Sequence, residues 1–157
     1  MPRAQVSPSI DLEYEVFGDA GAPPIVLVMG FAMQMIAWDE EFCRELASRG
    51  FRVVRFDNRD VGLSTKRRDL GPPDLVRVMV GDPGGARYAI RDMANDVAGL
   101  VAALDIAPVH LVGASMGGFI AQEAVITHPA KVRSLCSIMS TTGQSLILGL
   151  LDCIVNR

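Results

Sequence analysis

The sequence predicts an α/β fold, in which a predominantly parallel sheet is flanked by helices. A continuous apolar run at residues 25–29 is typical of a strand that is covered on both faces. A helical pattern and a second strand at residues 51–56 follow it within about thirty residues, the usual length of a βαβ unit. A further apolar run at residues 109–112 leads through a glycine-containing turn into another helical pattern. Strands that alternate with helices in this way form parallel sheets.

Length and composition predict one domain covering residues 1–157, because 157 residues of which 50% are hydrophobic can bury one core. A net charge of −3 provides no basic surface for nucleic acid. No run approaches eighteen apolar residues and the start lacks an apolar core of the secretory type, so we expect a cytoplasmic protein without a membrane partner. The three cysteines lack metal-ligand spacing and are expected to be reduced thiols: Cys43, Cys136 and Cys153.

The first half of the chain also shows an alternating strand, a helix and two loops. Leu12, Tyr14 and Val16 alternate with acidic residues, as in a half-buried strand near a sheet edge. The apolar spacing of residues 38, 42 and 46 predicts a short amphipathic helix, with Gly50 as its C-cap. The polar loop 57–64 could bind substrate, but local hydrogen bonds within the loop are the favoured interpretation.

The second half begins with a surface excursion over residues 66–85, which is rich in Pro, Gly and charge and is expected beside the site entrance. An apolar stripe predicts a helix over residues 90–104. After the glycine-containing turn, a helix is expected to stop at His128-Pro129, and a last strand to cover residues 132–139. An apolar tail, residues 143–157, completes the chain.

The turn between the 109–112 strand and the next helix carries Ser115 with Gly113 and Gly117 on either side. A serine at such a turn must take a strained backbone conformation, and its second neighbours must be small because they approach closely. The turn lifts the Ser115 hydroxyl above the strand end, and the helix start places the Met116 N–H beside it. The pattern is typical of a nucleophile elbow, although G-x-S-x-G also arises by chance.

A rival interpretation is the glycine-rich turn of short-chain dehydrogenases, which binds a dinucleotide. That turn follows the first strand of its fold, whereas this one lies two thirds of the way along the chain. No tyrosine follows Tyr88, so the catalytic Tyr/Lys pair of that family has no tyrosine to supply it. We therefore predict neither a dinucleotide nor any other cofactor, and no metal site.

From about residue 12 to residue 142 the sequence resembles the α/β-hydrolase superfamily, and within it the esterase and haloperoxidase-like branch. Three motifs in the family's order carry the resemblance: Met29-Gly30-Phe31, Asp57-x-Arg59-x-x-Gly62-x-Ser64 and Gly113-x-Ser115-Met116-Gly117-Gly118. The resemblance implies that Ser115 is the nucleophile of a carboxylic ester hydrolase acting on a small-molecule ester. It implies further that the N–H groups of Phe31 and Met116 form the oxyanion hole. Met29 stands where the family commonly has histidine.

The resemblance also implies a truncated core that lacks the cap and the C-terminal strands, which in the family carry the acid and the histidine of the triad. His110 lies five residues before Ser115 on a strand, about 16 Å away, and His128 lies about 20 Å away along a helix. Ser140, Thr141 and Thr142 occupy the turn where some members place the acid. We therefore expect weak hydrolysis, or hydrolysis that depends on another chain.

An alternative is a catalytically incompetent binding or oligomerisation module. The last strand is expected to form an open sheet edge, and such edges recruit partners. Together with the apolar tail, this edge predicts a homodimer or higher homo-oligomer.

Overall fold

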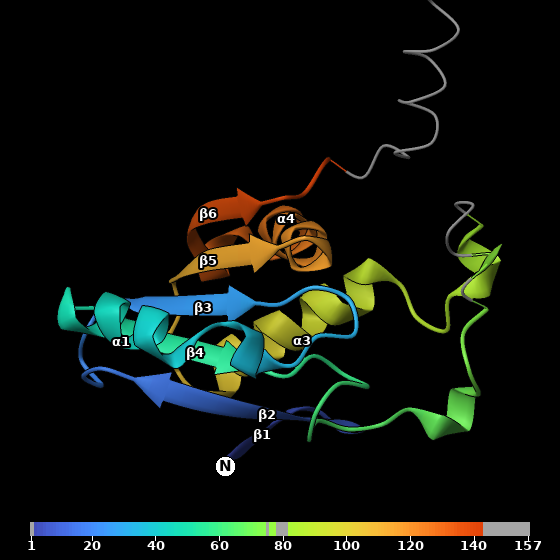
Figure 1. The fold of residues 1–157 in the computed structure, drawn as a ribbon, viewed down its shortest axis with the longest axis horizontal. Helices are drawn as coiled ribbons and strands as arrows, with labels where there is room; N and C mark the ends of the chain where they lie inside the picture. The colour runs from blue at the N-terminus through green and yellow to red at the C-terminus, as the bar shows by residue number, and fades with distance from the viewer. Residues whose placement is uncertain (1, 75, 78–81, 143–157) are drawn as a thin grey trace, which may run out of the picture.

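A computed structural model describes residues 2–74, 76–77 and 82–142, and its centre is a mixed sheet of six strands (Figure 1). Their order across the sheet is β1-β2-β4-β3-β5-β6. Strand β3 pairs in parallel with β4 and β5, and β5 pairs in parallel with β6, whereas β2 is antiparallel to both β1 and β4. The strands are β1 (Arg3–Ser7), β2 (Ile10–Phe17), β3 (Pro24–Val28), β4 (Arg52–Phe56), β5 (Val109–Ala114) and β6 (Val132–Ile138).

Within the described residues, three α-helices cover the sheet, and the predicted α/β class is confirmed. Helices α3 and α4 pack against each other on one face, and α1 lies on the other (Figure 1). The larger apolar cluster lies beneath α3 and α4, and a smaller one lies beneath α1. The helices are α1 (Glu40–Ser48), α3 (Ile90–Ala103) and α4 (Met116–Thr127), and the 3₁₀ turns are η1 (Met35–Ala37), η2 (Arg68–Leu70), η3 (Pro83–Gly85) and η4 (Pro129–Lys131).

Strand β1 was not predicted, and it changes the surroundings of β2. The β1 strand pairs along β2, and α3 packs against it closely: a Cβ on Gly99 would lie 2.4 Å from the Val6 carbonyl oxygen. Glu13 is only 3% exposed and its carboxylate lies 3.3 Å from the Arg3 guanidinium, whereas Val16 is 38% exposed. The predicted alternation is therefore wrong beyond Leu12, because Glu13 is buried where it pairs with β1, and its carboxylate contacts a half-exposed Arg3.

Helix α1 begins two residues later than its apolar spacing predicts. The Asp39 carboxylate accepts the Glu41 N–H at 2.8 Å, which caps the helix and fixes its start. Phe42 remains 41% exposed and stacks on Trp38, with ring centroids 5.9 Å apart, while Cys43 is fully buried. Trp38 is buried and Leu46 packs against the same apolar cluster, as the stripe predicts, but Cys43 rather than Phe42 lies against the sheet.

The buried Cys43 thiol is expected to react with alkylating reagents much more slowly than the exposed Cys136 thiol. Burial raises the pKa of Cys43, so little of the reactive thiolate is present at neutral pH. In native protein treated with iodoacetamide, peptide mass spectrometry should show Cys43 modified at least about 100-fold more slowly than Cys136. Equal rates in native protein would contradict this burial, and equal rates in urea are the control.

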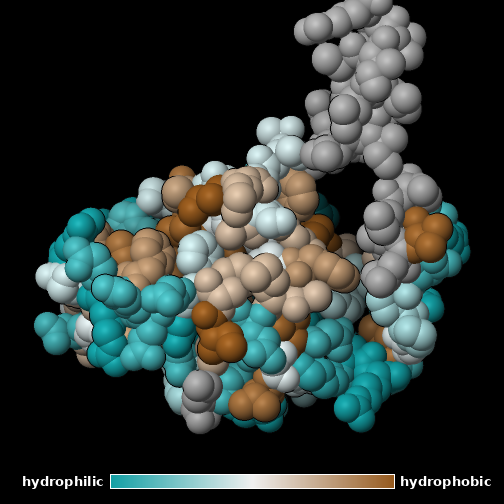
Figure 2. Space-filling view, viewed as in Figure 1, coloured by the Kyte–Doolittle hydropathy of each residue, from teal (hydrophilic) through white to brown (hydrophobic). Residues whose placement is uncertain are grey.

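Strand β6 forms one edge of the sheet, as predicted, and within the described residues no strand pairs with its outer side. Leu135 and Ile138 are each more than a third exposed, and Met139 is 82% exposed. Figure 2 shows apolar side chains along the edge where Figure 1 places β6. The tail at residues 143–157 lies outside the described residues. In the described part of the chain, every helix is too short or too polar to span a bilayer.

Candidate active site

Ser115 occupies the turn between β5 and α4. Strand β5 ends at Ala114 and α4 begins at Met116, so the predicted strand, turn and helix are all present. The Ser115 backbone has φ +54° and ψ −122°, which non-glycine residues rarely adopt. Its N–H donates to the Ile138 carbonyl at 2.9 Å, which ties the turn to the end of β6. The Ser115 residue is exposed, so its hydroxyl is accessible at the carboxyl end of the sheet.

Two glycines make this tight turn possible. A Cβ on Gly113 would lie 2.2 Å from the Gly117 carbonyl oxygen, and a Cβ on Gly117 would lie 2.1 Å from the Val28 carbonyl oxygen. Both distances are far inside van der Waals contact. The contacts show that α4 begins directly against the ends of β5 and β3. The spacing of the two glycines in the sequence therefore reflects a steric requirement on both sides of Ser115.

The loop that follows β3 passes beside Ser115. A Cβ built on Gly30 would lie 3.2 Å from the Ser115 Cβ and 3.6 Å from its Oγ. Phe31 is the next residue along this loop, and its side chain is 60% exposed. Met116 is the first residue of α4, where backbone N–H groups have no acceptor within the helix. The structure thus brings together Ser115, Met116 and the Phe31 loop, as the sequence predicts.

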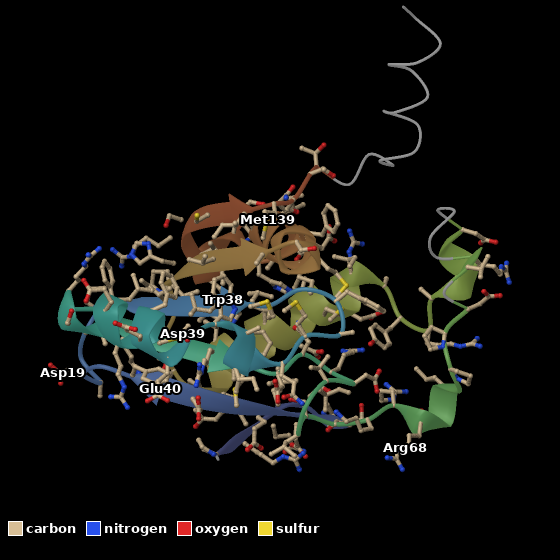
Figure 3. The ribbon with its side chains drawn as sticks, in the orientation of Figure 1. Asp19, Trp38, Asp39, Glu40, Arg68 and Met139 are labelled. Atoms are coloured by element: carbon tan, nitrogen blue, oxygen red, sulfur yellow. The ribbon has the colours of Figure 1, made fainter. Side chains whose placement is uncertain are left out.

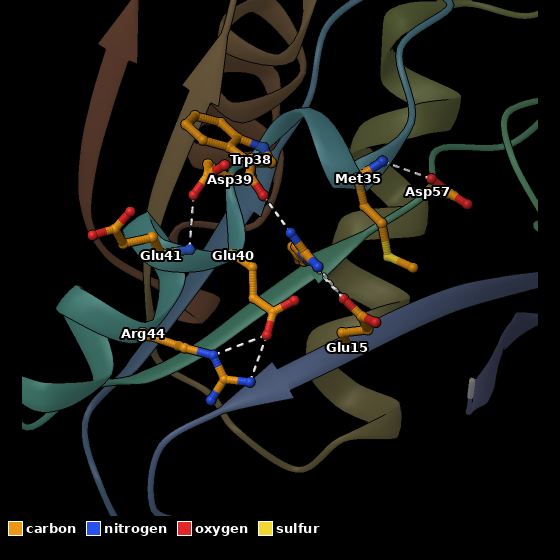
Figure 4. Close-up of polar contacts among 9 residues, drawn as sticks. Glu15, Met35, Trp38, Asp39, Glu40, Glu41, Arg44 and Asp57 are labelled. Atoms are coloured by element: carbon orange, nitrogen blue, oxygen red, sulfur yellow. Dashed lines mark hydrogen bonds and ion pairs between the residues drawn. The ribbon is translucent and has the colours of Figure 1, made fainter.

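Side chains from the 57–64 loop hold this neighbouring loop in place. The Asn58 side-chain amide donates to the Met29 carbonyl at 2.8 Å. The Asp57 carboxylate accepts the Met35 N–H at 2.7 Å (Figure 4), and it also accepts the Leu63 N–H at 3.1 Å. The Asp57–Leu63 bond lies within the 57–64 loop and, with the 2.6 Å bond from the Ser64 hydroxyl to the Asp57 carbonyl, confirms the favoured local hydrogen-bonding role of this loop. The bonds to Met29 and Met35 brace both ends of the loop that carries Phe31.

A buried ion pair anchors the same 57–64 loop to α3. The Arg59 guanidinium donates to both carboxylate oxygens of Asp96, at 2.5 and 2.7 Å, and both side chains are less than a tenth exposed. The Tyr88 ring lies 5.0 Å from the Arg59 guanidinium carbon. Burial, with the charge and hydrogen bond of Asp60, raises the pKa of Tyr88 to about 12. Tyr88 therefore remains a neutral phenol at physiological pH.

A pocket of about 520 Å³ opens beside the Ser115 turn. Phe31 and Met116, the two residues expected to form the oxyanion hole, both line it, although Ser115 itself does not. Its remaining walls come from the 57–64 loop, from α3 and from residues 66–73 and 87–88. The sequence did not predict four basic residues that line these walls: Lys66, Arg67, Arg68 and Arg87. The available signal was the Lys-Arg-Arg run at residues 66–68, in a chain of net negative charge.

Both histidines of the sequence contact other partners. The His110 Nδ1 lies 2.7 Å from the Ser134 Oγ, and the His128 Nε2 lies 2.8 Å from the Asn95 Oδ1. His128 follows the far end of α4, which is about 18 Å long for its twelve residues. Among the described side chains, none supplies an imidazole to Ser115. The same part of the chain contains no cluster of three metal-ligating side chains.

Comparisons with known proteins agree with this geometry. The sequence profile of the family described as alpha/beta hydrolase fold matches residues 23–152. The chain is 32% identical over 124 residues to a protein of Variovorax paradoxus named as the carbamate hydrolase RutD, covering 79% of this chain and 40% of that protein. It is 26% identical over 136 residues to rhodomycin D methylesterase DauP of Streptomyces sp., covering 86% of this chain and 41% of that protein.

A solved structure from a study of carboxylesterases of Nitrososphaera gargenis superimposes with a TM-score of 0.75 at 25% identity. It covers 99% of this chain and 52% of that chain. The present chain thus spans between two fifths and half the length of these relatives. With the elbow geometry at Ser115, the profile match over residues 23–152 shows that this chain belongs to the alpha/beta hydrolase family.

Proposed function

We propose that the chain is the nucleophile-bearing part of a serine hydrolase that cleaves carboxylic esters. The observation that carries the proposal is the strained, exposed Ser115 on a strand-to-helix turn, with the Gly30 backbone so near that an added Cβ would lie 3.2 Å from the Ser115 Cβ. A family relative named as a methylesterase and a solved structure from a study of carboxylesterases support ester chemistry. Ser115 is the nucleophile in this proposal.

The reaction begins when the Ser115 Oγ attacks the acyl carbon of the ester and its proton passes to a base. The carbonyl oxygen becomes negatively charged, and the backbone N–H groups of Phe31 and Met116 stabilise it. The carbon–oxygen bond to the alcohol then breaks, and the alcohol leaves with a proton. Water attacks the resulting acyl-serine in the same way, which releases the carboxylic acid and restores the Ser115 hydroxyl.

The base is not an imidazole of this chain, because His110 and His128, the two histidines of the sequence, are bonded elsewhere. In this proposal it comes from further polypeptide, either beyond the described part or in another chain. Without a base, a serine hydrolase keeps about 10³- to 10⁴-fold catalysis over water from its oxyanion hole and binding. We therefore expect slow ester turnover by the isolated chain. The same bonding of both imidazoles favours a second candidate, a binding module without catalytic turnover.

A fluorophosphonate probe tests the nucleophile, because it forms a covalent bond with a nucleophilic serine, and we expect this labelling to be slow without the base. Intact-mass and peptide analysis should find one adduct, on Ser115, and Ser115→Ala should abolish it. Ser134→Ala is a matched control, because this exposed serine lies 2.7 Å from an imidazole and offers the alternative nucleophile. Labelling that persists in Ser115→Ala, or that disappears in Ser134→Ala, would refute the assignment. Absence of any adduct after prolonged incubation would favour the binding module.

A further inference from the structure

The pocket beside Ser115 is lined by an unusual excess of positive charge. Five of its lining side chains are basic and one, Asp60, is acidic, whereas the whole chain carries a net charge of −3. A concave surface lined by one sign of charge concentrates ligands of the opposite sign. Apolar side chains lie in the same walls, including Phe31, Met93 and Met116, and these suit the hydrocarbon part of a small molecule.

Two of the five cations are neutralised by carboxylates. Arg59 forms its buried ion pair with Asp96, and Arg67 forms an ion pair with Asp69 at 2.8 Å. These ion pairs hold the pocket walls in place, and they leave little net positive charge on Arg59 and Arg67 to attract a ligand. A third cation, Arg68, is exposed, and Figure 3 places it on the outer side of its loop.

The other two cations are held in place without being neutralised. The Lys66 Nζ donates to the Gly62 carbonyl at 2.6 Å, and the Arg87 Nε donates to the Pro72 carbonyl at 2.8 Å. Within the described residues neither of these side chains forms an ion pair. A carbonyl orients an ammonium or guanidinium group but carries no net charge, so most of each positive charge remains for an incoming group.

The acidic side chain in the pocket wall, Asp60, already accepts hydrogen bonds from its neighbours. The Asp60 carboxylate accepts a hydrogen bond from the Arg67 backbone N–H at 2.6 Å and another from the neutral Tyr88 phenol. Burial lowers the pKa of Lys66, and the negative charges of Asp57 and Asp60 oppose this effect. An anion bound in the pocket would add to that opposing effect and favour the charged ammonium.

We propose that Lys66 and Arg87 form an anion subsite, and that the pocket selects esters carrying a carboxylate over neutral esters of the same size. This inference rests on the proposed ester hydrolysis at Ser115. The reacting ester group would lie at the Phe31 and Met116 wall, and the carboxylate at the wall that carries Lys66 and Arg87. Lys66 and Arg87 act here as binding residues and take no part in bond breaking.

The test is equilibrium binding to the Ser115→Ala variant, which leaves the ester intact. Monomethyl glutarate and dimethyl glutarate are nearly the same size and differ by one negative charge. In NMR titrations at low ionic strength, the monoanion should bind about tenfold more tightly, and added salt should reduce this difference. Equal affinities would overturn the proposal.

A double substitution, Lys66→Gln with Arg87→Gln, should reduce the preference for the monoanion to less than about twofold. Arg44→Gln with Arg49→Gln is the matched control, because it removes two exposed positive charges from α1 and its C-cap and should leave the preference unchanged. If the Lys66/Arg87 variant still preferred the monoanion, the proposed subsite would be wrong. It would also be wrong if the Arg44/Arg49 control lost this preference. The binding readout does not depend on Ser115 chemistry, so a failure of fluorophosphonate labelling alone would refute the nucleophile and not the subsite.

Discussion

Replacing Gly117 with alanine should destabilise the protein by about 3 kcal/mol and slow fluorophosphonate labelling of Ser115 at least about 100-fold. The added Cβ would lie 2.1 Å from the Val28 carbonyl oxygen and 2.9 Å from that of Met29. Both contacts are with backbone atoms, which cannot rotate away as a side chain can. The start of α4 must therefore move away from β3, and this movement separates the Met116 N–H from the loop that carries Phe31.

Urea denaturation and the rate of adduct formation measure the two effects of Gly117→Ala. Gly21→Ala is the matched control, since Gly21 is exposed and a Cβ there would meet nothing within 4 Å. We expect Gly21→Ala to change the free energy of unfolding by less than about 0.5 kcal/mol. If Gly117→Ala labelled at the same rate as the unsubstituted protein, the proposed elbow geometry would be refuted.

Replacing Arg59 with methionine should lower the free energy of unfolding by about 3–5 kcal/mol at pH 7. The substitution leaves the Asp96 carboxylate buried against α3 without its ion-pair partner, and an unpaired buried charge is costly. Arg44→Met is the control, because the exposed pair of Arg44 with Glu40 on α1 is expected to contribute less than about 0.5 kcal/mol. Equal effects of the two substitutions would contradict the burial of the Arg59–Asp96 pair.

The effect of Arg59→Met should depend on pH in a defined direction. Burial raises the pKa of Asp96, and Arg59 opposes that rise, so removing Arg59 raises the pKa further. A carboxyl group whose pKa is higher in the folded state than in the unfolded state favours folding most below its unfolded pKa, near 3.9. That contribution is lost as the pH rises through the folded pKa. Urea denaturation of Arg59→Met and of the unsubstituted protein should therefore give a smaller difference in the free energy of unfolding at pH 4 than at pH 7.

The elements that the sequence predicted well are those whose signal is local. The β5 strand, the turn at Ser115 and the start of α4 lie within one short stretch, and their apolar run and glycine spacing encode the turn directly. The residues of α3 likewise show their buried stripe at helical spacing. Strand β1 gave no such signal, because its short, polar sequence is held by pairing with β2 and by packing against α3.

The sequence by itself determined the α/β class, the order of the main strands and helices, and the turn that exposes Ser115, because each depends on neighbours in the chain. Only the tertiary structure decided which distant residues meet. It buried Glu13 beside Arg3, paired Arg59 with Asp96, and placed Lys66 and Arg87 around one pocket next to Met116. The physical reason is that these contacts join residues of different strands, helices and loops, whose relative positions are set by packing and strand pairing and not by any local pattern.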